Sequence, residues 1–110
     1  CGSSQPASTD TAATMSAKCV ELEPGNSTYL DTYAWVLFKM KNYTLASFYI
    51  KQAIANLEGD NAEVFDHYGD ILYMNGDKEE ALVWWKKAAE LGLESETLEK
   101  KINTGELTDF

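Results

Sequence analysis

The chain contains no arginine, and this absence limits the ligands that it is suited to bind. Its nine cationic side chains are all lysines, against 18 acidic residues, so the net charge is −9. Nucleic acids and anionic membranes are bound by neutralising phosphates, which a chain of this charge does not favour. The lack of arginine also excludes bidentate guanidinium clamps on phosphate and arginine fingers.

Histidine, cysteine and long apolar runs are scarce as well. The single histidine, His67, cannot build a multi-histidine metal site, and two cysteines are too few for a disulfide framework. The longest apolar stretches, such as residues 34–38, fall far short of the roughly 20 residues that a membrane helix needs. We therefore expect no metal, no cofactor, no nucleic-acid ligand and no transmembrane segment.

Helical periodicity dominates what is present. From Met15 onward apolar residues recur at helical spacing, no strand-like alternation is sustained, and Pro24 is the last proline. The sequence predicts an all-α protein with helices at about residues 12–22, 28–40, 43–57, 62–75, 78–91 and 94–103.

Residues between these segments have the chemistry of helix ends. Three glycines stand where a left-handed residue would end a helix, at positions 59, 76 and 92. Side chains able to cap the next helix follow the breaks, and Asp77 with Glu80 resembles a capping box. The expected caps are Asn26 or Ser27, Asn42, Asp60 or Asn61, and Asp77.

The chain also repeats itself. Residues 27–57 align with residues 62–92 at an offset of 35, so that small residues meet small ones and large residues meet large ones. A period of this length with two helices predicts a repeated helical hairpin. The matched pairs include Asp31/Asp66, Tyr33/Tyr68, Ala34/Gly69, Leu37/Leu72, Phe38/Tyr73, Ala46/Ala81, Tyr49/Trp84 and Ala53/Ala88.

This pattern resembles the tetratricopeptide repeat (TPR) family, whose repeats of about 34 residues alternate large and small residues at fixed places. The second unit matches it with Phe65, Tyr68-Gly69, Leu72, Ala81, Trp85 and Ala88, and the first with Leu30, Tyr33-Ala34, Leu37, Ala46, Ile50 and Ala53. Upstream, Cys19 takes a small-residue place and Pro24 the repeat-ending place. The resemblance implies a right-handed superhelix of antiparallel helix hairpins.

The implied organisation is about two and a half repeats with a C-terminal cap. We expect a flexible tail at 1–11, a half repeat at 12–26, repeats at 27–61 and 62–93, and a capping helix at 94–103. On that helix and just before it, Leu93, Leu98 and Ile102 should face inward and Lys100 and Lys101 outward. The half repeat favours a longer bacterial protein with upstream repeats.

In TPR proteins the first helix of each repeat lines a concave groove that holds a peptide or a partner helix. The resemblance places eight residues there: Asp31, Trp35, Phe38, Lys39, Asp66, Asp70, Tyr73 and Met74. Aromatic residues and methionine are common interface anchors, and carboxylates beside them favour a ligand with basic groups. They also argue against the role of TPR domains that hold a C-terminal carboxylate with cationic side chains. Alternatively, the aromatics only pack against the neighbouring unit.

The sequence therefore predicts a non-enzymatic protein–protein interaction scaffold, because no nucleophile is placed beside a base such as His67. One alternative is a purely structural end-cap of a longer TPR solenoid. Another is a lipid-anchored envelope assembly factor, since Cys1 followed by small residues resembles a mature bacterial lipoprotein; Cys1 is otherwise a fragment boundary. Either the bacterial cell envelope or the cytoplasm remains open as the location.

Overall fold

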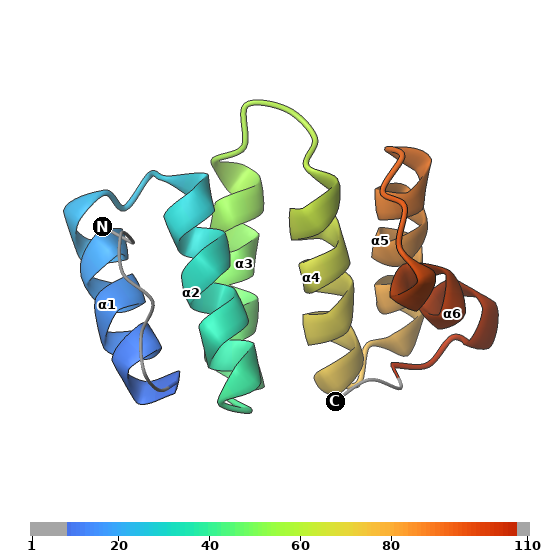
Figure 1. Ribbon diagram of the computed structural model, residues 1–110, viewed down its shortest axis with the longest axis horizontal. Coiled ribbons are helices and arrows are strands. Elements are labelled where there is room, and N and C mark those ends of the chain that lie inside the picture. Colours follow the sequence, from blue (N-terminus) through green and yellow to red (C-terminus); the bar gives the residue numbers. More distant parts are fainter. Residues whose placement is uncertain (1–8, 108–110) are drawn as a thin grey trace. The chain divides into compact units, whose positions relative to one another are not determined.

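The computed structural model describes residues 9–107, and this part of the chain contains helices and no strand. The helices are α1 (Thr9–Leu22), α2 (Ser27–Lys39), α3 (Tyr43–Ala55), α4 (Ala62–Met74), α5 (Lys78–Glu90) and α6 (Glu96–Thr104) (Figure 1). The predicted all-α class is confirmed, and every helix end lies within three residues of the predicted one. Residues 1–8 of the predicted tail lie outside the described residues.

The chain divides into two compact units, which are described separately. Unit 1 extends to Leu57 and contains α1, α2 and α3; unit 2 starts at Glu58 and contains α4, α5 and α6. Within unit 1, α2 packs against α3 and α1 packs against α2. Within unit 2, α4 packs against α5, and α6 packs against α5.

Asparagine and serine side chains begin most of the helices. Asn26, Asn42 and Asn61 accept hydrogen bonds from the backbone N–H three residues ahead, at 3.1, 3.4 and 3.2 Å, which satisfies one unpaired donor in each first turn. Ser95 does the same for α6 at 3.3 Å. Asp77 occupies the N-cap position of α5, but its side chain makes no capping bond, so the expected capping box is wrong.

The turn inside each hairpin has the same geometry in both units. The backbone N–H of Asn42 donates to Leu37 O at 2.9 Å, and that of Asp77 donates to Leu72 O at 2.9 Å. The residue just before each donor is left-handed: Lys41 at φ 66° and Gly76 at φ 94°. Gly92 is also left-handed, whereas Gly59 is not, because it lies in the middle of a longer connection and not next to a helix end.

The buried positions repeat at the predicted offset of 35. In unit 1 the buried small and large side chains alternate across α2 and α3, and those of unit 2 do so across α4 and α5. Small residues at matched places let the two helices approach closely, and large ones fill the space between them. The buried pairs are Leu30/Phe65, Ala34/Gly69, Leu37/Leu72, Ala46/Ala81, Ile50/Trp85 and Ala53/Ala88.

Gly69 and Trp85 form the tightest contact inside unit 2. The Trp85 side chain is fully buried. A Cβ placed on Gly69 would overlap the Trp85 indole and would lie 3.1 Å from Ala81 O, so only glycine fits there. In unit 1 the matched pair is Ala34 with the smaller Ile50, which explains why the same place tolerates a methyl group.

The C-terminal helix is oriented differently from the prediction. Leu98 faces inward as expected, at 1% exposure, but Lys101 is buried too, at 2%, whereas Ile102 is half-buried. Leu98 and Lys101 are three residues apart and therefore share a face of α6. The predicted outward orientation of Lys101 is wrong; Lys100 is exposed as expected.

Candidate functional site

The predicted groove residues of unit 1 lie together on α2. Asp31, Trp35 and Phe38 are separated by four and three residues and so share one side of the helix, with Lys39 next to them. We call these four residues the α2 aromatic face. The adjacent side, about 100° round the helix axis, carries the buried Leu30, Ala34 and Leu37, while Asp31, Trp35 and Phe38 are half-buried and Lys39 is exposed.

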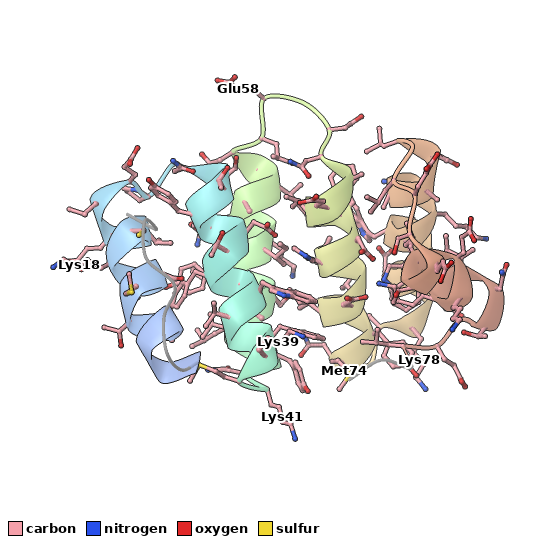
Figure 2. The ribbon with its side chains drawn as sticks, viewed as in Figure 1. Lys18, Lys39, Lys41, Glu58, Met74 and Lys78 are labelled. Carbon is pink, nitrogen blue, oxygen red and sulfur yellow. The ribbon has the colours of Figure 1, made fainter. Side chains whose placement is uncertain are left out.

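Ring stacking holds the aromatic part of this face in one arrangement. The Trp35 and Phe38 rings lie 4.9 Å apart with 7° between their planes, and the edge of Phe38 meets Tyr43 at 5.5 Å. Lys39 Nζ lies 5.0 Å from the Trp35 ring centroid, a cation–π contact. Figure 2 shows Lys39 and Lys41 near the C-terminal end of α2. The rings thus form a preorganised, partly exposed platform.

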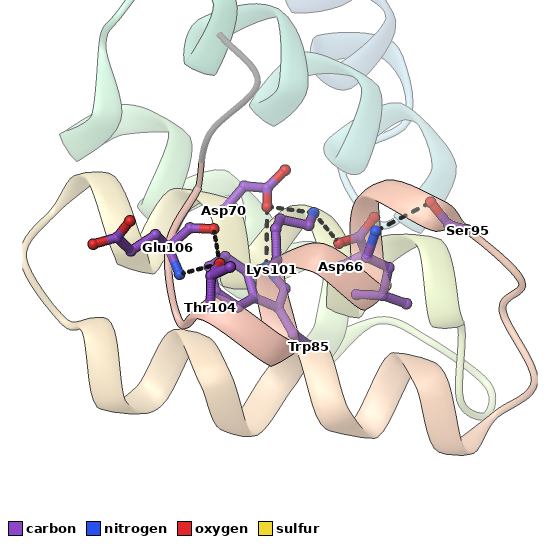
Figure 3. A network of polar contacts seen from close by, with 8 residues as sticks. Asp66, Asp70, Trp85, Ser95, Lys101, Thr104 and Glu106 are labelled. Carbon is purple, nitrogen blue, oxygen red and sulfur yellow. Dashed lines mark hydrogen bonds and ion pairs between the residues drawn. The ribbon is translucent and has the colours of Figure 1, made fainter.

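The predicted groove residues of unit 2 have a different environment. Asp66 and Asp70, one turn apart on α4, both accept a hydrogen bond from Lys101 Nζ of α6, at 2.6 and 2.7 Å (Figure 3). Trp85 Nε1 of α5 donates to Asp70 Oδ1 at 3.0 Å, and Lys101 Nζ lies 5.3 Å from the Trp85 ring centroid. We call these four residues the Lys101 cluster; they connect all three helices of unit 2.

Burial makes the Lys101 cluster an electrostatically demanding site. The side chains of Lys101 and Asp70 are 3% and 7% exposed, and that of Asp66 is 20% exposed. Burial raises the pKa of Asp70, and nearby Asp66 acts in the same direction, while the charge and hydrogen bond of Lys101 and the bond from Trp85 oppose the rise. One ammonium shared by two carboxylates leaves the cluster short of positive charge.

The two other predicted groove residues of unit 2 lie at the end of α4. Tyr73 and Met74 are half-buried. The Tyr73 ring lies 6.0 Å from that of Trp85, and Lys78 Nζ lies 5.4 Å from the Tyr73 centroid. Figure 2 places Met74 and Lys78 at the same end of unit 2. This end of α4 therefore presents one aromatic ring, that of Tyr73, beside Lys78, and not a stacked pair like that of α2.

A second aromatic feature of unit 2 surrounds Trp84. This side chain is half-buried, and its ring contacts those of Phe65 and Tyr68 at 5.0 and 4.9 Å, with Lys87 Nζ at 4.3 Å from its centroid. Burial, then the charges of Glu80 and Asp77, raise the pKa of Tyr68. An open pocket of about 390 Å³ lies beside the Trp84 ring, lined by Asp60, Phe65, Trp84, Lys87, Glu90 and Leu91.

The remaining candidates can be placed only in part. Cys19 is buried, at 7% exposure. His67 is half-buried on α4. Cys1, the candidate lipidation site, lies outside the described residues. Within residues 9–107 there is no group of three histidine, cysteine or acidic residues arranged for a metal ion, and no helix long and apolar enough to cross a membrane.

Sequence reasoning found the aspartates of the Lys101 cluster but missed its cation. The signal was present in the repeat: Lys101 stands 35 residues after Asp66, so a lysine occupies the place that holds aspartate in both preceding units. A charge reversal at a repeated position is the pattern expected for an ion pair between the two helices that carry it, here α4 and α6. Leu107, buried at 5% exposure beyond α6, was also missed.

Comparison with known proteins gives matches among solved structures only. No protein-family model matches the chain, and none of the curated proteins matches it. The chain is similar to the first TPR of Spaghetti (RPAP3) bound to the HSP90 peptide SRMEEVD, with a TM-score of 0.80 and 18% identity over 88% of this chain and 76% of that one.

Two further solved structures agree. The first TPR domain of human RPAP3 gives a TM-score of 0.79 at 18% identity, over 88% of this chain and 76% of that one. The TPR2AB domain of yeast Sti1, in a complex with pHSP90, gives 0.71 at 18% identity, over 88% of this chain and 39% of that one. Identity this low speaks for the fold alone. Together with buried positions that recur every 35 residues, these similarities show that the chain has the fold of tetratricopeptide repeat domains.

Proposed function

We propose that this chain is a non-enzymatic interaction module that binds a peptide or a partner helix, with the α2 aromatic face as its contact surface in unit 1. The observation that carries the proposal is the stacked Trp35–Phe38 pair, which is half-buried on the side of α2 next to its buried residues. Large, rigid aromatic side chains provide much contact area at little entropic cost and dominate binding energies. Two similar structures hold HSP90 partners, which supports the same general use of this fold.

The preferred ligand is a segment with basic side chains. The α2 aromatic face contains one carboxylate, that of Asp31, and one cation, that of Lys39. The whole chain carries a net charge of −9. The peptide SRMEEVD bound by the RPAP3 domain ends in three acidic groups and an apolar residue, so its sequence is poorly matched to this charge. Opposite charge accelerates the encounter and selects the partner more than it adds affinity.

Selection of short random peptides on the immobilised full chain tests this function. We expect the enriched peptides to combine lysine or arginine with an aromatic or aliphatic residue, and SRMEEVD to bind more weakly than they do. Trp35→Ala should weaken the selected peptides about ten-fold or more. Phe48→Ala is the matched control, because Phe48 is an aromatic residue of unit 1 that is 55% exposed and lies on α3, not on the α2 aromatic face. Equal losses for both variants would refute the assignment of the surface.

A purely structural role as the end-cap of a longer repeat protein is the second candidate. It is favoured by the way α6 closes unit 2, with Leu98, Lys101 and Leu107 all buried. Such a role requires upstream repeats, and it predicts that peptide selection enriches nothing that depends on Trp35. A longer natural chain with these repeats should then melt at a higher temperature than the 110 residues alone.

A further inference from the structure

α6 places a lysine of this chain on the two aspartates that the sequence assigned to a basic ligand. Lys101 Nζ donates to Asp66 Oδ1 at 2.6 Å and to Asp70 Oδ1 at 2.7 Å. The carboxylates come from successive turns of α4 and converge on one ammonium group, with the Trp85 ring beside it (Figure 3). This arrangement is a lysine-binding subsite that is filled from within the chain.

The subsite cannot simply be left empty. Asp70 is 5% exposed, and its other hydrogen-bond partner, Trp85 Nε1, is neutral. A buried carboxylate that loses its cation keeps its desolvation cost and loses its compensation. At a pH at which Asp70 is ionised, departure of Lys101 is therefore favourable only when another cation takes its place, which makes the process an exchange of one lysine for another.

The anchoring of α6 allows such an exchange. The helix has nine residues, too few to be stable without packing, and its buried residues are Leu98 and Lys101. It is joined to α5 by residues 91–95, which include Gly92 at φ 96°. Gly69 meets Trp85 directly between α4 and α5, so this contact can persist when α6 moves away, although Lys101 also lies over the Trp85 ring.

We propose that α6 is a displaceable internal occupant of the subsite formed by Asp66 and Asp70, and that unit 2 accepts in its place a partner segment presenting a lysine three residues after an apolar residue. The spacing is that of Leu98 and Lys101 in α6. Unit 1 lacks this subsite, because Trp35 stands where unit 2 has Asp70. The inference rests on the proposed function only in taking a peptide segment as the ligand.

Competition with the chain's own α6 sequence provides the test. The probe is a labelled synthetic peptide of residues 94–107, and its binding to the full chain is followed by fluorescence anisotropy. We expect it to bind, and to bind about ten-fold more tightly to a Lys101→Gln chain, in which the internal competitor is weakened. The same peptide carrying K101Q should bind about ten-fold more weakly to either chain. K100Q, in the chain or in the peptide, is the matched control and should change nothing, because Lys100 is exposed.

Hydrogen exchange of the wild-type chain gives a second readout that does not depend on any variant folding. Backbone amides of α6 should exchange faster than those of α4 and α5, and excess wild-type peptide should accelerate the α6 amides further. The proposal is overturned if α6 exchanges only together with α4, or if the wild-type and K101Q peptides bind the wild-type chain equally or not at all. Trp35→Ala should leave these results unchanged, so that failure here is separable from failure of the proposed function.

Discussion

Replacing Gly69 with alanine should destabilise unit 2, although the same change in an ordinary helix stabilises it. The gain in helix propensity is about 1 kcal/mol. Against it, the new methyl group overlaps the Trp85 indole and crowds Ala81 O at 3.1 Å, and overpacking of this kind costs about 1–3 kcal/mol. Displacing the indole also weakens its bond to the Asp70 carboxylate, worth about 1.5–3 kcal/mol.

The net loss is therefore about 1.5–5 kcal/mol in the free energy of unfolding, measured by urea denaturation. In a chain of this size it should lower the melting temperature by roughly 6–22 °C. Gly59→Ala is the control, because a Cβ there meets nothing within 4 Å, and it should change stability by less than about 0.5 kcal/mol.

A double variant connects the effect to the indole. Trp85→Ile combined with Gly69→Ala recreates the Ala34/Ile50 pair of unit 1, so its loss of stability should be smaller than the sum of the two single losses. If Gly69→Ala proves as stable as the wild type, the close approach of α4 to the Trp85 ring is not as described.

Three other outcomes are expected. Lys101→Gln should lower the free energy of unfolding by about 3 kcal/mol, because it removes the cation from a buried ion pair. Lys100→Gln should change it by less than about 0.5 kcal/mol. Similar urea midpoints for the two variants would contradict this. Because the pKa of Asp70 is raised on folding, the folded state holds its proton to higher pH than the unfolded state. The contribution of Asp70 to stability should therefore fall as pH rises above the usual aspartate range. In Asp70→Asn, the melting temperature should vary less with pH across that range than in the wild type. Asn61→Ala should cost about 1 kcal/mol through the lost capping bond, and Asp77→Ala should cost less because its side chain makes none; equal shifts in melting temperature would refute the distinction.

The repeat made much of the fold predictable from sequence. Small residues such as Ala46 and Ala81 are informative because close helix packing leaves no room for larger ones, and all the matched small positions are buried. The same limit on volume explains why unit 1 pairs Ala34 with Ile50 whereas unit 2 pairs the smaller Gly69 with the larger Trp85. Local chemistry was a poorer guide at helix ends, where Asp77 makes no side-chain cap and Gly59 stays outside the left-handed region.

The candidate site was less predictable, because its decisive contact joins distant parts of the sequence. Helical spacing correctly groups Trp35 with Phe38 and Asp66 with Asp70, since each pair lies on a single helix. It does not reveal that Lys101 turns inward, because a charged residue is normally assigned to solvent unless a partner is known. The partner is 31 residues away, and only packing of α6 against the other helices of unit 2 brings the two together.

The most direct test of the proposed function is a map of amide chemical-shift changes when a selected basic peptide is added to the isotope-labelled full chain. The account predicts that the largest changes in unit 1 fall on residues 31–39 of α2 and disappear in Trp35→Ala. Changes confined to α3 around Phe48, with α2 unaffected, would contradict it.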